Sequence, residues 1–220
     1  MKLVIFDVDG TIVDSQHMIV AAMTRAFEAH GLVVPPRDEI LSIVGLSLVQ
    51  AVGQLVDHHP DVPVEAVAGA YKDAFFSLRA AGTTAEPLYD GAFETLRALQ
   101  ARDDVVLAIA TGKSRRGVAQ LIEHYGLHGL FANIQTADDH PSKPDPAMIL
   151  AACAETGLAP SQAVMIGDTV FDITMARAAG ARALGVAWGY HEVADLQRAG
   201  ADLVIDRYDR LIAAVDRLLG

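Results

Sequence analysis

The sequence predicts an α/β fold built on a parallel β-sheet, and two observations lead to this prediction. The first is a set of short apolar runs that each stop at a small polar or acidic residue. These runs cover residues 3–6, 105–110 and 164–167, and they stop at Asp7, Thr111 and Asp168. Such runs are typical of strands buried on both faces. The second is that, from Pro87 onward, similar runs alternate with helical periodicity, which is the pattern of βαβ units.

The expected elements follow in order along the chain. A strand at residues 2–6 precedes helical periodicity at about 15–30, 38–57 and 64–81. After Pro87, helices are expected at about 91–101, 115–125, 146–156, 170–179, 191–199 and 208–219, and strands at 105–110, 131–135, 163–167, 182–187 and 202–205. Because no strand interrupts the first helical block, we interpret that block as an insertion. The predicted division is a core of residues 1–14 and 84–220 and an α-helical cap of residues 15–83, with hinges at Asp14-Ser15 and Gly82-Thr83-Thr84.

The amino-acid composition excludes several classes of protein. The 220 residues are 52% hydrophobic and carry a formal net charge of −11, so the chain can bury a large core and lacks a broad surface for nucleic acid or anionic membranes. The single cysteine, Cys153, permits no internal disulfide, which fits a reducing compartment. The first residues do not resemble a signal peptide, and no apolar stretch is long enough to span a membrane. We therefore expect a cytoplasmic protein, either a monomer or a homodimer, that binds neither nucleic acid nor membrane.

The first motif is Asp7-Val8-Asp9-Gly10-Thr11, directly after the first strand. Two carboxylates two residues apart suit a pair in which one attacks phosphorus and the other transfers a proton to or from the reacting oxygens. Taken alone, an Asp-x-Asp-Gly string more often only builds a turn. The motif is not an EF-hand, because its later acidic positions do not fit.

A second acidic pair stands at Gly167-Asp168-Thr169-Val170-Phe171-Asp172, where a strand passes into a helix. Asp168 can cap that helix, and Asp172 follows one turn later. The simple interpretation is a capped helix with an acidic first turn. Together with Asp7, however, the pair predicts a Mg²⁺ site, since hard cations bind carboxylate oxygens.

Two further strings can bind an anion. Lys143-Pro144-Asp145-Pro146 lies before a helix, and its prolines restrict the backbone that carries the lysine. Thr111-Gly112-Lys113-Ser114 ends a strand and opens a helix, so a hydroxyl and backbone N–H groups converge there. Each has an ordinary alternative, a solvated lysine for the first and a plain helix cap for the second.

These motifs are expected to meet in space. In an open α/β sheet the ligand site lies at the carboxyl ends of the strands. Asp7, Thr111 and Asp168 each follow a predicted strand, so we expect them to face one cleft.

Along the chain the four motifs begin at Asp7, Thr111, Lys143 and Gly167. In this order and at these spacings they resemble the haloacid dehalogenase superfamily of phosphohydrolases over essentially the whole chain. The helical insertion after the first motif resembles the subclass with an α-helical C1 cap, and the chain is most similar to the phosphoglycolate phosphatase group. The resemblance implies a Rossmann-like core with an α-helical cap. It also implies Mg²⁺-dependent hydrolysis of a small phosphorylated metabolite, a phosphomonoester, through an aspartyl-phosphate.

The resemblance also implies roles for individual residues. Asp7 would be the nucleophile and a Mg²⁺ ligand, and Asp9 the general acid and base that also offers its backbone carbonyl to Mg²⁺. Thr111, Gly112 and Lys143 would hold the phosphoryl group. The metal ligands would be Asp7, Asp9 and Asp168, with Asp172 as a partner behind them or through water. Gly112 departs from the family pattern, which usually has Asn there.

Two alternatives stay open at this point. One is a phosphomutase similar to β-phosphoglucomutase, although Ile19 and Leu48 stand where those enzymes usually carry His and Arg. The other is a non-catalytic binding protein on the same fold, against which the intact set of acidic residues and Lys143 argues.

The cap sequence also allows a prediction about the substrate. Residues 40–56 carry no charge, and Arg25 and Arg37 are the only strong cations between Lys2 and Lys72. We therefore expect a substrate whose non-phosphate part meets hydroxyl, amide and apolar groups around Gly45-Leu46-Ser47, without a strong second anion.

Overall fold

Six parallel strands form one sheet, and the α/β class is confirmed. The computed structural model describes residues 1–56, 61–82 and 84–220. The strands are β1 (Lys2–Phe6), β2 (Val105–Thr111), β3 (Asn133–Thr136), β4 (Ala163–Gly167), β5 (Arg182–Val186) and β6 (Leu203–Ile205). They lie in the order β3-β2-β1-β4-β5-β6, so β1 occupies a central position between β2 and β4.

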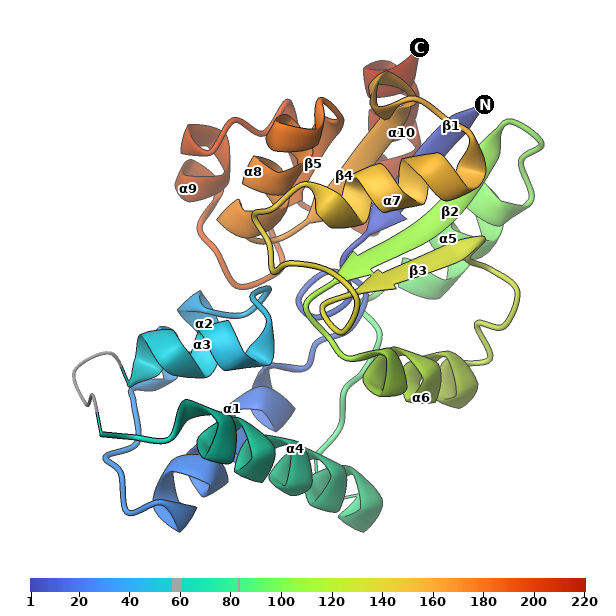
Figure 1. Cartoon of the computed structure of the whole chain (residues 1–220). Helices are drawn as coiled ribbons and strands as arrows, with labels where there is room; N and C mark the ends of the chain where they lie inside the picture. The colour runs from blue at the N-terminus through green and yellow to red at the C-terminus, as the bar shows by residue number, and fades with distance from the viewer. Residues whose placement is uncertain (57–60, 83) are drawn as a thin grey trace.

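Helices follow each strand and cover the sheet on both faces (Figure 1). The α-helices are α1 (Gln16–Ala29), α2 (Arg37–Ser42), α3 (Leu48–Leu55), α4 (Val64–Ala81), α5 (Ala92–Gln100), α6 (Arg115–Tyr125), α7 (Ala147–Thr156), α8 (Val170–Ala179), α9 (Val193–Arg198) and α10 (Leu211–Leu219). Short 3₁₀ turns occupy Pro160–Gln162 and Tyr208–Arg210. In the part of the chain that the structure describes, none of the helices has both the length and the apolar character needed to cross a bilayer.

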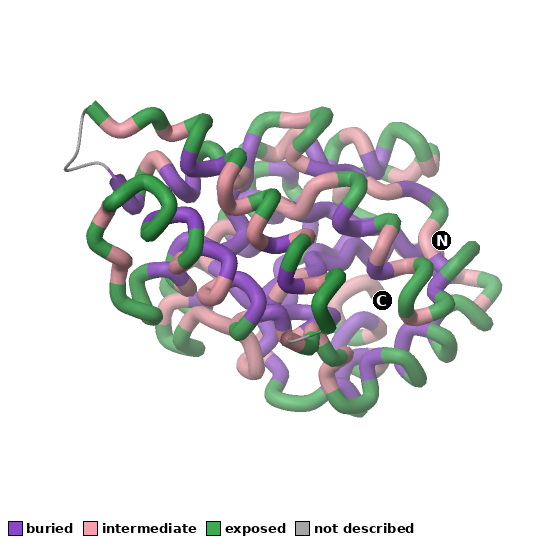
Figure 2. The backbone as a smooth tube through the Cα atoms, turned by 90° about the horizontal axis from the view of Figure 1, so that it is seen from below, coloured by how far each residue is buried: buried purple, intermediate pink, exposed green. Residues whose placement is uncertain are grey.

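The central strand shows why this sequence forms a two-sided core. Along β1, Val4 and Phe6 join a hydrophobic cluster with α5, α6 and α10. Leu3 and Ile5 join a second cluster with α7, α8 and α9 on the other face. Successive side chains of a strand point to opposite faces, so an uninterrupted apolar run fills both clusters. Figure 2 shows the buried backbone running through the middle of the molecule, with exposed segments outside it.

Helices α1 to α4 pack around a hydrophobic cluster of their own, which includes Met18, Val52 and Phe75. Figure 1 shows this group at the end of the sheet toward which the strand arrows point, while both termini lie at the opposite end. The predicted boundaries of the cap stay a prediction, and Thr83, at one predicted hinge, lies outside the described residues.

One expected helix differs from the structure in a way that matters for the site. The periodicity at 38–57 predicts one helix, but the chain forms α2 and α3 with a loop at residues 43–47 between them, and residue 57 lies outside the described residues. Gly45 in this loop has a φ of 104°, a conformation that side-chain-bearing residues rarely adopt. Because the break falls at the sheet end of α2 and α3, it brings backbone rather than a helix face to the core.

Candidate active site

The carboxyl ends of β2, β1 and β4 bring together the motifs that contain Thr111, Asp7 and Asp168. Asp7 directly follows β1, Thr111 ends β2, and Asp168 directly follows β4. β1 pairs with both of the other strands, so the three residues lie on adjacent strands at one edge of the sheet. All three are buried, with at most 1% of their surface exposed.

Lys143 reaches this group from the loop between β3 and α7, although β3 carries none of the other three residues. Its side chain has no exposed surface, and its Nζ lies 2.9 Å from Asp7 Oδ1 and 2.6 Å from Asp172 Oδ1. Burial works against its charged form, but the carboxylates of Asp172 and Asp7 outweigh it and raise the pKa of Lys143. Lys143 is therefore a fixed ammonium between two carboxylates, not a solvated surface lysine.

The two oxygens of Asp7 differ in their surroundings. Oδ1 accepts hydrogen bonds from the Val8 backbone N–H, at 2.7 Å, and from Lys143. Oδ2 is buried and has no hydrogen-bond partner among the described residues. Burial, reinforced by the charge of Asp172, raises the pKa of Asp7 to about 7 even though Lys143 opposes the shift. A buried acceptor without a partner is costly, so Oδ2 is the atom that a ligand would satisfy.

The carboxylate of Asp168 is closely surrounded by the loops that contain Gly10 and Gly189. It accepts hydrogen bonds from the Thr11 hydroxyl at 2.9 Å and the Tyr190 N–H at 2.8 Å. A Cβ at Gly10 or Gly189 would come within 2.3 Å of its carboxylate, so both positions need glycine. Burial first, and the charges of Asp172 and Asp7 after it, raise the pKa of Asp168 well above its usual value.

Asp172 is satisfied by its own helix and by Lys143. Its Oδ2 accepts from the hydroxyl and the N–H of Thr169, while the Thr169 hydroxyl caps α8 in return. Its Oδ1 accepts from Lys143. Oxygens of Asp7, Asp168 and Asp172 lie within 4.8 Å of one another, which is a spacing suited to a metal ion. Because both oxygens of Asp172 already have protein partners, its main task in this arrangement is to hold Lys143.

Asp9 lines the same pocket as Asp7 and has its own set of partners. Its Oδ1 lies 2.8 Å from Lys113 Nζ and accepts a hydrogen bond from the Ser15 hydroxyl at 2.7 Å. Lys113 also lies 3.5 Å from Glu86, which forms an ion pair with Arg79 of α4. A chain of charges therefore connects α4 to Asp9.

Thr111 and Gly112 form the floor of the pocket beside Asp7. The Thr111 hydroxyl accepts a hydrogen bond from the Lys113 N–H at 3.2 Å. A Cβ at Gly112 would lie only 2.5 Å from the Leu46 carbonyl oxygen and 2.6 Å from that of Gly45. The loop between α2 and α3 thus rests directly on Gly112, which explains why a side chain such as Asn has no room there.

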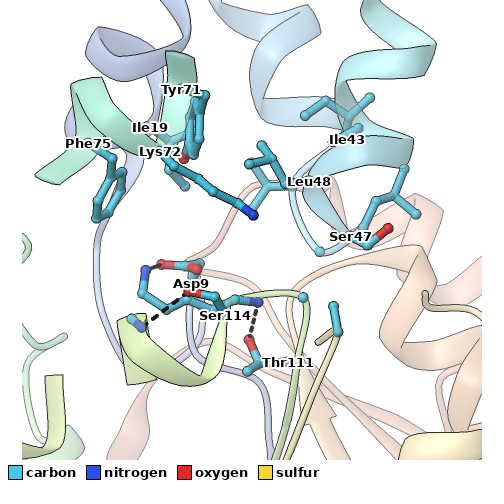
Figure 3. Close-up of a pocket in the computed structure, with 18 of the residues that line it drawn as sticks. Asp9, Ile19, Ile43, Ser47, Leu48, Tyr71, Lys72, Phe75, Thr111 and Ser114 are labelled. Atoms are coloured by element: carbon cyan, nitrogen blue, oxygen red, sulfur yellow. Dashed lines mark hydrogen bonds and ion pairs between the residues drawn. The ribbon is translucent and has the colours of Figure 1, made fainter. Parts of the chain in front are cut away.

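The pocket has a volume of about 270 Å³ and lies between the sheet edge and helices α1, α3 and α4. Figure 3 shows Asp9, Thr111 and Ser114 on one side of it and Ile19, Leu48, Lys72 and Phe75 on the other. The predicted contact segment, Gly45-Leu46-Ser47, lines it. So do Ile19 and Leu48, the two positions at which mutases carry polar groups.

Two lysines of the pocket were missed by sequence reasoning. Lys113 stands inside the Thr111-Gly112-Lys113-Ser114 string, but its pairing with Asp9 depends on tertiary structure. Lys72 lines the pocket from α4, a cation that lies just beyond the stretch considered in the charge argument, whereas the expectation of a substrate without a strong second anion stays a prediction. Nothing in the sequence around Lys72 shows that this exposed residue, like the half-buried Tyr71 before it, borders the pocket.

The sequence and the fold of this chain were compared with those of known proteins, and both are similar to those of hydrolases. The sequence profile of the haloacid dehalogenase-like hydrolases matches residues 4–186. The chain is 34% identical to a protein named probable phosphatase IndB from Dickeya dadantii, over 99% of this chain and 94% of that protein. It is 31% identical to a phosphoglycolate phosphatase from Psychrobacter arcticus, over 99% and 96%. A crystal structure of a hydrolase from Pseudomonas syringae superposes with a TM-score of 0.87 at 27% identity, covering 100% of both chains.

Proposed function

The chain belongs to the haloacid dehalogenase-like hydrolase family, and on this premise we propose that it uses Mg²⁺ to hydrolyse a small phosphomonoester through a phosphorylated Asp7. It is a phosphoric monoester hydrolase, like the named phosphatases that it resembles along its length. One observation carries the proposed chemistry. A buried carboxylate oxygen, Asp7 Oδ2, has no partner among the described residues, on a side chain that lines the pocket beside a fixed ammonium.

The acidic residues fit a divalent cation. Asp7, Asp168 and Asp172 bring three carboxylates together, and Lys143 is the ammonium that pairs with two of them. The excess negative charge and the unpartnered Asp7 Oδ2 favour a hard cation with oxygen ligands. We propose Asp7, Asp168 and the backbone carbonyl of Asp9 as ligands of Mg²⁺. When bound, Mg²⁺ would offset negative charge on the phosphoryl group.

The protein groups then divide the reaction into two steps. In the first, an oxygen of Asp7 bonds to phosphorus while the bond from phosphorus to the alcohol oxygen breaks, and the carboxylic acid of Asp9 gives that oxygen its proton. In the second, Asp9 takes a proton from water, the water oxygen bonds to phosphorus, and the Asp7 carboxylate is released with inorganic phosphate. Proton transfer of this kind is worth about 10²–10⁴-fold.

Three groups would hold the phosphoryl group during transfer. The Thr111 hydroxyl and the Gly112 N–H stand between the end of β2 and the N-terminus of α6, an end that favours anions. Lys143 contributes a full positive charge that Asp172 keeps in position. In phosphoryl transfer, positioning and charge neutralisation supply most of the catalysis.

The helical cap of residues 15–83 is proposed to close the site over the core. Three contacts support this: the loop backbone at Gly45 and Leu46 rests on Gly112, the Ser47 N–H donates to the Ser142 hydroxyl at 2.7 Å, and the Ser15 N–H donates to the Tyr190 hydroxyl at 3.2 Å. Closure of this kind excludes water and selects substrates. A cytoplasmic location and a monomeric or homodimeric state remain predictions.

The proposal is tested with the purified full chain and a panel of phosphate esters that includes p-nitrophenyl phosphate. Phosphate release should require Mg²⁺, stop in EDTA and return when Mg²⁺ is added back. Asp168→Ala should raise the Mg²⁺ concentration needed for half-maximal rate or abolish turnover. Full activity in EDTA would overturn the metal-dependent mechanism, and intramolecular transfer without phosphate release would indicate a mutase.

A further inference from the structure

We infer that the alcohol part of the substrate is apolar, so that the enzyme prefers phosphomonoesters of apolar alcohols over those of polyhydroxylated alcohols such as sugars. This inference rests on the proposed function. It concerns the part of the pocket that lies beyond the phosphoryl group, on the side of the cap helices.

The side of the pocket that the cap helices form consists mainly of aliphatic and aromatic side chains. Ile19 comes from α1, Leu48 is the first residue of α3, and Tyr71 and Phe75 come from α4; we call these four side chains the cap wall. Figure 3 shows the cap wall across the pocket from Asp9. An ester whose phosphoryl group is bound at the sheet edge therefore extends its alcohol part toward an apolar surface.

The aromatic part of the cap wall is held in place by its own packing. The rings of Tyr71 and Phe75, one helical turn apart on α4, have centroids 5.8 Å apart and planes inclined by 38°. Phe75 also packs edge to face against Phe76 at 6.4 Å, and Lys113 Nζ lies 5.0 Å from the centre of its ring. Because these rings are ordered by the protein itself, an apolar ligand that contacts them pays little for ordering them on binding.

The backbone donors beside the cap wall already have acceptors. The Leu46 N–H donates to the Ile43 carbonyl oxygen at 3.3 Å, and the Ser47 N–H donates to the Ser142 hydroxyl at 2.7 Å. A substrate hydroxyl that moves from water to the cap wall therefore gives up hydrogen bonds that these donors do not replace, which is unfavourable. A methylene group in the same place gains free energy by leaving water.

The charge on this side of the pocket is compatible with an apolar ligand. Among the residues that the structure describes, Lys72 is the one charged residue that helices α1 to α4 contribute to the lining. Lys72 is exposed, and an exposed lysine keeps its ammonium in water while its stem covers apolar surface. The ammonium therefore needs no anionic partner on the ligand.

The test compares esters that differ only in the distal group. We would measure kcat/KM for a series of straight-chain alkyl phosphates, and for the matched pair pentyl phosphate and 4-hydroxybutyl phosphate. In this pair a hydroxyl replaces the terminal methyl group, remote from the ester oxygen, so the leaving groups are equally reactive. Each added methylene should raise kcat/KM by about fourfold until the pocket is filled, and pentyl phosphate should be preferred by about tenfold.

Inhibition by the corresponding phosphonates separates binding from chemistry. Pentylphosphonate and 4-hydroxybutylphosphonate lack the ester oxygen and are not hydrolysed, so their inhibition constants report binding alone. The inference expects the pentyl compound to bind more tightly by about the same factor as the esters show. Equal inhibition constants for the two phosphonates would overturn it.

Variants of the cap wall test whether this surface is the source of the preference. Leu48→Asn, nearly equal in size, should lower the ratio of pentyl to 4-hydroxybutyl ester by about fivefold or more, whereas Leu48→Met should keep it. Val33→Asn is the matched control, because Val33 is 85% exposed and is not among the residues that line the pocket. The ratio should change only when Leu48 becomes polar.

Failure of this inference can be told apart from failure of the proposed function. If the wild type hydrolyses p-nitrophenyl phosphate with Mg²⁺ but does not prefer pentyl phosphate, or if Leu48→Asn keeps the full preference, the inference is wrong and the phosphatase assignment stands. If the wild type hydrolyses no ester in the panel, the proposed function is wrong and the inference falls with it.

Discussion

The ammonium of Lys113 lies 2.8 Å from the carboxylate of Asp9, and the surrounding structure holds it there. Its stem passes over Gly117, where a Cβ would come within 3.0 Å of it. Its nitrogen lies 5.0 Å from the centre of the Phe75 ring and 3.5 Å from Glu86. The proposed general acid is therefore oriented by a lysine that is itself fixed by core and cap together.

Replacing this lysine should affect proton transfer more than phosphate binding. Lys113→Met should lower kcat/KM for alkyl phosphates by about tenfold or more, as part of the 10²–10⁴-fold that general acid catalysis contributes. The loss should be smaller for p-nitrophenyl phosphate, whose leaving group needs little protonation. Equal losses on both esters would show that Lys113 does not act through Asp9.

The Gly112 position tests the contact between cap and core. Gly112→Asn introduces a side chain where the Leu46 and Gly45 carbonyl oxygens lie 2.5 and 2.6 Å from the new Cβ. Overpacking of this kind costs about 1–3 kcal/mol, so we expect a lower melting temperature, a raised KM, or both. Wild-type values for both quantities would mean that the cap does not rest on Gly112 in solution.

The acidic cluster predicts how stability changes with pH in the absence of metal. The pKa of Asp7 is raised from 3.8 to about 7 by burial. A carboxyl group whose pKa is higher in the folded state contributes stability at low pH, and that contribution is lost as the pH rises from about 4 to 7. In EDTA the free energy of unfolding should therefore fall between pH 5 and pH 7, by at most about 1.4 kcal/mol per pH unit for this group.

Urea denaturation at several pH values measures this slope. Asp7→Asn should make it shallower, because the amide does not titrate. Added Mg²⁺ should stabilise the wild type more at pH 8 than at pH 6, since binding must displace protons at the lower pH. A slope that is the same in Asp7→Asn would contradict the pKa assigned to Asp7.

Much of the core could be predicted from the sequence because its signals are local. β2 and β4 are short, mainly apolar runs, and β4 has the predicted bounds of residues 163–167. Three of the four motifs fall at strand ends, so the rule for open sheets is enough to bring Asp7, Thr111 and Asp168 to one edge. Lys143 needed the family resemblance, since nothing in its own loop shows which strand end it approaches.

The cap residues that line the pocket could not be predicted as well, because their positions depend on how the cap helices pack against one another and against the core. Residues 40–56 are free of charge and favour a helix throughout, so the break around Gly45 has no strong local signal beyond the glycine itself. Whether Lys72 faces solvent or the pocket depends on the rotation of α4 about its axis, which packing against α1 and α3 determines. Lys72 lines the pocket and lies directly after the stretch of the cap whose cations the sequence analysis considers.

The central claim is that Asp7 carries the phosphoryl group, and chemical trapping tests it most directly. Enzyme mixed with a rapidly hydrolysed ester and Mg²⁺ would be quenched in acid during turnover and reduced with borohydride, which converts an acyl phosphate into an alcohol. The account predicts homoserine in place of Asp7 in the peptide mass spectrum, and at no other aspartate, with none formed when substrate is omitted. Modification of a different residue, or steady turnover by Asp7→Asn, would contradict it.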